Sequence, residues 1–89
     1  MAEQAKYIIV EEVMGCYDVP FIFPLGIPHS DFAERMRITP NKILSAGFCR
    51  FYSHGDDVKV SAYGESVSLK TKALPTDARL IARTLGFGE

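Results

Sequence analysis

The chain has 89 residues, of which 47% are hydrophobic, and a formal net charge of −1 at pH 7. This length fits one domain over residues 1–89 with a limited core, and the hydrophobic fraction excludes a disordered chain. The near-zero charge excludes a general electrostatic attraction to nucleic acid or to an anionic membrane. The most apolar window, residues 19–28, contains three prolines and is too short to span a bilayer, so we expect a cytoplasmic protein with no membrane contact.

The first elements along the chain read as a β-hairpin. Residues 7–14 are rich in β-branched side chains, which are typical of a strand. Gly15 and Asp18 then supply turn chemistry, and Phe21, Ile22 and Phe23 form a second short strand. Prolines flank this second strand and cannot donate to a ladder of hydrogen bonds, so we expect it at the edge of a sheet.

A short helix is predicted after Pro28. Asp31 and Glu34 have the spacing of a partial capping box, and Phe32 and Met36 lie four apart on one apolar face. The Thr39-Pro40 pair predicts the end of the helix, because the residue before a proline is steered away from helical angles.

Residues 43–52 form the most apolar strand candidate, with one charge and with large apolar residues at both parities. Such a strand is central in its sheet and covered on both faces. Residues 58–63 then alternate cleanly, Gly64-Glu65 fits a type II′ turn, and residues 66–70 continue the alternation. These three segments predict an antiparallel meander.

A second helix closes the sequence. Pro75 suits its first turn, Gly86 suits its end, and an apolar stripe runs along Leu74, Ala78, Ile81 and Leu85. The resulting order is ββαβββα. We therefore expect an α+β fold, with a mostly antiparallel five-stranded sheet and two helices packed on one face.

Two helices on one face leave the other face of the sheet open. The side chains expected there combine aromatic rings with cations, as protein interfaces do. They are Phe48, Arg50, Tyr52, Lys59, Tyr63 and Lys70. This pattern predicts a non-catalytic protein-interaction module, a homodimer or a binder of another protein, that uses the open face.

The same surface allows a second interpretation, a module that binds single-stranded nucleic acid. Such proteins stack bases on aromatic rings and hold phosphates with Lys and Arg. The slightly acidic net charge and the absence of an RNP-type signature count against this alternative.

The cysteines and histidines are the remaining candidates for chemistry. Cys16, His29, Cys49 and His54 show neither a Cys-x-x-Cys pair nor the close histidine pair of common zinc sites. A metal-binding protein or small enzyme that uses these residues requires them to converge in the fold. No glycine-rich phosphate loop is present. The sequence thus predicts no cofactor, no metal and no catalytic residue, and favours a protein that is not an enzyme.

Overall fold

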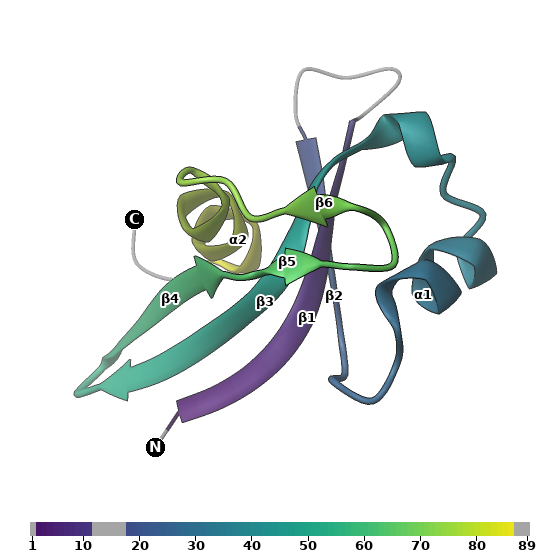
Figure 1. Cartoon of the computed structure of the whole chain (residues 1–89). Coiled ribbons are helices and arrows are strands. Elements are labelled where there is room, and N and C mark those ends of the chain that lie inside the picture. The colour runs from purple at the N-terminus through teal and green to yellow at the C-terminus, as the bar shows by residue number, and fades with distance from the viewer. Residues whose placement is uncertain (1, 12–17, 87–89) are drawn as a thin grey trace.

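The computed structural model describes residues 2–11 and 18–86, apart from the side chains of Ala2 and His54. The elements in chain order are β1 (Ala2–Glu11), β2 (Asp18–Phe23), α1 (His29–Arg35), the 3₁₀ turn η1 (Pro40–Lys42), β3 (Ile43–His54), β4 (Asp57–Tyr63), β5 (Glu65–Ser66), β6 (Thr71–Lys72) and α2 (Asp77–Leu85). The long strands form an antiparallel sheet in the order β2-β1-β3-β4, and β5 pairs with β6 in a small sheet of its own (Figure 1).

The expected α+β class, the antiparallel sheet and the order of elements are confirmed. β2 is an edge strand, as its prolines predict. The expected five-stranded sheet is approximate, because residues 2–11 and 18–86 form a sheet of four long strands and a separate two-stranded hairpin. Of the turn predicted through Gly15 and Asp18, residues 15–17 lie outside the described residues, and Asp18 is the first residue of β2.

The two helices lie on opposite faces of the sheet, which corrects the expected placement on one face. On the first face, called the α2 face, Ile81 of α2 packs against Tyr7, Ile9 and Cys49. On the second face, called the α1 face, Ala33 of α1 packs with a cluster of sheet residues that comprises Ile8, Phe23 and Ala46. Adjacent residues of β1 therefore enter different cores, because successive side chains of a strand point to opposite faces.

A buried hydrogen bond fixes the start of α2 to the sheet. The Tyr7 hydroxyl donates to Asp77 Oδ2 at 2.5 Å, and the same oxygen accepts the backbone N–H of Leu74 at 2.9 Å. Burial, followed by the bond to Asp77, raises the pKa of Tyr7 above its ordinary value. The helix ends at Gly86, whose φ of 80° is the left-handed value that glycine adopts without strain.

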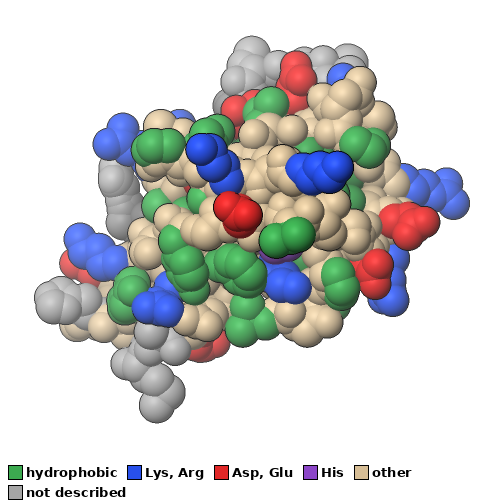
Figure 2. All heavy atoms as spheres, in the orientation of Figure 1, with side chains coloured by type: hydrophobic (Ala, Val, Ile, Leu, Met, Phe, Trp, Pro, Cys, Tyr) green, Lys and Arg blue, Asp and Glu red, His purple; other side chains and the backbone are tan. Residues whose placement is uncertain are grey.

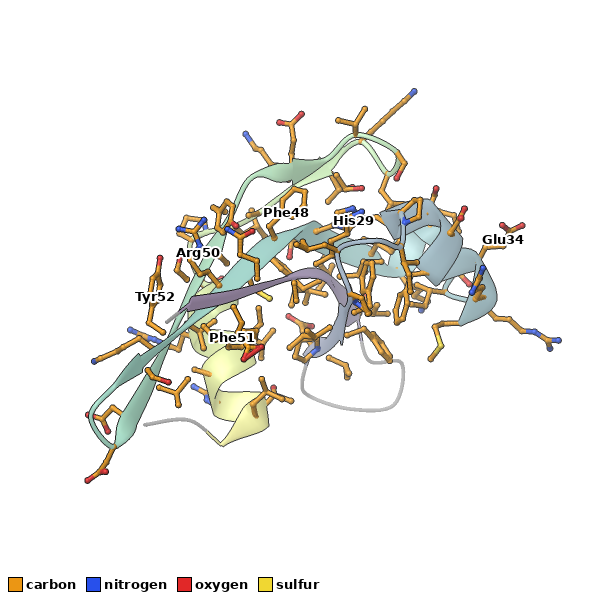
Figure 3. The ribbon with its side chains drawn as sticks, turned by 90° about the horizontal axis from the view of Figure 1, so that it is seen from below. His29, Glu34, Phe48, Arg50, Phe51 and Tyr52 are labelled. Atoms are coloured by element: carbon orange, nitrogen blue, oxygen red, sulfur yellow. The ribbon has the colours of Figure 1, made fainter. Side chains whose placement is uncertain are left out.

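The predicted strand over residues 66–70 is wrong, because residues 67–70 form the turn of the β5–β6 hairpin. Serine hydroxyls bond the backbone here and favour a turn over a ladder. Ser66 Oγ accepts the Leu69 N–H, and Ser68 Oγ accepts the Ser30 N–H at the start of α1, both at 3.2 Å. The hairpin thereby lies over β3 on the α1 face (Figures 1 and 3). Leu69 of its turn packs against the cluster of Ile8, Phe23, Ala33 and Ala46.

Candidate functional site

The part of the α1 face that the hairpin leaves uncovered carries most of the predicted interaction residues. Arg50 pairs with Gln4 on β1 and with Ser61 on β4, and Tyr52 pairs with Lys59. Paired residues of antiparallel strands share a face. Figure 3 shows Phe48, Arg50 and Tyr52 on this side of β3 and Phe51 on the side of α2. We call this region the tyrosine–arginine surface. It consists of Gln4, Arg50, Tyr52, Lys59 and Tyr63.

Direct contacts hold the tyrosine–arginine surface together. The Arg50 guanidinium lies 5.3 Å from the centre of the Tyr63 ring, and its Nη1 donates to the Tyr52 hydroxyl at 3.4 Å. With its amide oxygen turned toward Arg50, Gln4 accepts from Arg50 Nε at 3.1 Å and from Nη2. The bond to Tyr52 raises the pKa of Arg50, which is therefore charged at every physiological pH.

The tyrosine rings of this surface remain accessible. Tyr52 is 38% exposed and Tyr63 is 36% exposed. Figure 2 shows the same side of the molecule, where apolar side chains gather next to Lys and Arg below the β5–β6 hairpin. An exposed aromatic group that is already packed against a cation loses little conformational freedom when a partner covers it.

Two of the predicted surface residues take other positions. Phe48 is half-buried beneath the surface, and its ring stacks on Tyr63 with centroids 5.9 Å apart. Lys70 lies in the β5–β6 turn with a φ of 55°, where it lines a shallow hollow of about 470 Å³ with Lys72. The structure thus makes Phe48 a support of the surface and leaves Lys70 on a separate part of the α1 face.

His29 is a buried residue whose contacts the sequence does not reveal. It is 4% exposed, and its Nε2 donates to the carbonyl oxygen of Gly47 at 2.8 Å. Its ring lies edge-on to Phe23 and to Phe48, with centroids 5.5 and 5.7 Å apart. Burial is the main cause that lowers the pKa of His29; the bond to the Gly47 carbonyl opposes this effect, and the nearby charge of Lys6 adds to it.

The geometry does not bring the cysteine and histidine candidates together. Cys49 is fully buried on the α2 face, whereas His29 lies on the α1 face. Burial raises the pKa of the Cys49 thiol to about 11, so it carries little of the thiolate that a nucleophile needs. Cys16 and the side chain of His54 lie outside the described residues. Within residues 2–11 and 18–86, no three His, Cys, Asp or Glu side chains form a metal-binding group.

Comparisons with protein-family models, with curated proteins and with solved structures give no match to this chain. Neither helix of the described part is long and apolar enough to cross a membrane. The contacts and exposure of the tyrosine–arginine surface are therefore the basis for inferring a function.

Proposed function

We propose that this chain is a cytoplasmic, non-catalytic protein-interaction module that forms a homodimer through the tyrosine–arginine surface. The observation that supports this most directly is the packed arrangement of Tyr63, Arg50 and Tyr52 on an exposed part of the sheet. Tyr and Arg are enriched among the few side chains that contribute most of the binding energy at protein interfaces. Their mutual contacts hold them in place before any partner arrives, which lowers the entropic cost of association.

A second copy is the partner that we favour. A two-fold contact buries the same surface on both copies, so it brings the exposed rings of one copy against those of the other. The Arg50–Tyr63 contact shows that a guanidinium fits over a ring of this surface. The cation of one copy can occupy the equivalent position over an exposed tyrosine of the other, which offsets the repulsion between like charges.

Light scattering over a wide range of concentrations tests the homodimer. Tyr63→Ala removes the ring that carries Arg50 and should weaken self-association at least about tenfold, the effect of losing a typical interface anchor. Leu85→Ala is the matched control, since Leu85 is 45% exposed on α2, on the other side of the sheet, and its removal should leave association unchanged. A wild-type protein that stays monomeric at millimolar concentration would exclude the homodimer.

Binding of single-stranded nucleic acid is a second candidate for the same surface. The observation that favours it is that Arg50 and Lys59 accompany two exposed tyrosines, while no member of the tyrosine–arginine surface is acidic. Fluorescence anisotropy of a labelled oligonucleotide at low and at physiological salt tests this candidate. Binding that weakens with salt and is lost in Tyr52→Ala would support it, and no binding at low salt would exclude it.

A further inference from the structure

A continuous series of contacts joins the tyrosine–arginine surface to the start of α1. Tyr63 stacks on Phe48, and Phe48 meets the ring of His29, which is the first residue of α1. His29 also bonds the carbonyl of Gly47, the residue before Phe48. One imidazole therefore holds both the helix and the strand position that supports the surface.

The hydrogen bond to the Gly47 carbonyl fixes the tautomer of the neutral imidazole. A carbonyl oxygen only accepts, so Nε2 carries the hydrogen and the ring is neutral when Nδ1 is unprotonated. Protonation at Nδ1 places a full positive charge on a side chain that is 4% exposed and that contacts two phenylalanine rings. A buried charge without a partner of opposite sign is costly.

No carboxylate compensates for such a charge in the described structure. Lys6 of β1 is the charged group that acts on the imidazole, and its Nζ is held nearby by the Ile27 carbonyl oxygen at 2.9 Å. The charged residues of α1 and of the β5–β6 hairpin are exposed and point to solvent. They are Asp31, Glu34, Arg35, Glu65, Lys70 and Lys72.

We propose that His29 is a pH-sensitive latch, which keeps α1 and Phe48 in place at neutral pH and releases them when it is protonated. The imidazolium gains hydration only if α1 moves away from β3. When α1 moves, Phe48 no longer supports the Tyr63 ring, so acid weakens self-association through the tyrosine–arginine surface. This last step rests on the proposed function, whereas the latch itself does not.

The direction of the pH effect follows from the folded and unfolded pKa values. The pKa of His29 is lowered in the fold, and in the unfolded chain it has its ordinary value of about 6.5. The unfolded state therefore binds the proton first. The stabilisation from neutral His29 is complete above about pH 6.5 and is lost as the pH falls below it, with the folding constant decreasing by up to about tenfold per pH unit.

Urea unfolding of wild type and of His29→Gln between about pH 8 and pH 5.5 tests the latch. Glutamine reaches a similar position, can donate to the Gly47 carbonyl and does not titrate. We expect the folding constant of wild type to fall with acid and that of His29→Gln to stay level. Lys6→Gln removes the nearby positive charge and should reduce the loss. Equal pH dependence in wild type and His29→Gln would overturn the proposal.

Light scattering at the same pH values tests the coupling to the surface. We expect the dimer of wild type to dissociate more readily in acid and that of His29→Gln to be insensitive to pH. A dimer dissociation constant that does not change with pH in either protein would overturn the coupling. A His29-dependent loss of stability in a protein that never self-associates would support the latch and contradict the proposed homodimer.

Discussion

Gly47 of β3 lies close to the backbone at the end of β4. A Cβ atom at this position would be 2.6 Å from the carbonyl oxygen of Tyr63 and 3.3 Å from the Cβ of Ala73. The distance between this Cβ and the Tyr63 carbonyl oxygen is shorter than a normal contact. The oxygen belongs to the backbone, which cannot move aside as a flexible side chain can. Glycine is therefore required here by space.

Gly47→Ala should destabilise the protein by about 2 kcal/mol or more, since it forces the backbone of β3 and β4 apart. Chemical denaturation monitored by circular dichroism measures the loss. Gly26→Ala is the matched control, because nothing lies within 4 Å of its added Cβ, and its effect should stay within about 0.5 kcal/mol. Equal stabilities of the two variants would contradict the proposed clash.

The sequence predicts the positions of some residues in the fold and not those of others. The two-residue period of a strand is enough to place Phe48, Arg50 and Tyr52 on one face, as the structure confirms. The contact between His29 and Gly47 joins residues 18 positions apart, and no local pattern encodes it. The burial of His29 depends on the path between β2 and α1, which propensity does not determine.

At the scale of the elements, α1 differs from its sequence-based prediction at its start. The expected capping box at Asp31 and Glu34 does not form, because the helix begins at His29 and its N-cap residue, Pro28, has no side chain that can accept a hydrogen bond. The first N–H groups of a helix have no partner within it, and proline at the N-cap reduces their number by one because it has no N–H. The start of the helix is held instead by the His29 bond to β3 and by the Ser68 hydroxyl, which accepts the Ser30 N–H.

The end of α1 is a Schellman motif without its usual glycine. Arg37 has a φ of 57°, its N–H bonds the Glu34 carbonyl at 3.1 Å, and the Ile38 N–H bonds the Ala33 carbonyl at 2.8 Å. Ile38 then packs in the same cluster as Ala33, which is the hydrophobic contact that accompanies this motif.

Arg37→Gly should stabilise the protein by about 0.5–1 kcal/mol, because glycine adopts a positive φ without the strain that a Cβ causes. Thermal unfolding measures the gain as a higher Tm. Arg37→Ala separates the cause, since it removes the long side chain and keeps the strained conformation. A gain of equal size in Arg37→Ala would assign the effect to the charge.

The placement of the helices on opposite faces has a signal in the sequence of β1 as well as in residues 43–52. Tyr7, Ile8 and Ile9 are consecutive large apolar residues, and all are buried to 2% exposure or less. Consecutive burial in a strand requires cover on both faces. The apolar stripe expected along α2 is only partly realised, because Leu74 and Leu85 are exposed and Ile81 enters the core.

At the scale of the whole molecule, β1 and β3 belong to both cores. Tyr7 and Cys49 contribute to the α2 core, while Ile8 and Ala46 contribute to the α1 core. The two strands lie between the α1 core and the α2 core and contribute side chains to both. A loss of packing in one core therefore destabilises strands on which the other core depends. A small domain built in this way should unfold in one cooperative step.

Ile81→Ala should cost about 2–5 kcal/mol, the usual range for a fully buried isoleucine, and the loss should appear on both faces. Amide hydrogen exchange checks this. The free energy of opening of the slowest amides should fall by the same amount in β1, β3 and α2. Leu85→Ala is the control within the same helix, and its effect should be below about 1 kcal/mol because Leu85 is 45% exposed. Unchanged protection in β1 after Ile81→Ala would contradict a single cooperative unit.

The bond between Tyr7 and Asp77 joins residues that are 70 positions apart in the chain. During translation, at about 5–20 residues per second, Tyr7 leaves the ribosome seconds before its acceptor does. During that interval the apolar α2 face of the partly synthesised sheet is exposed to water or to a chaperone, because α2 has not yet been made. The nascent protein is therefore most vulnerable to aggregation just before its second helix emerges.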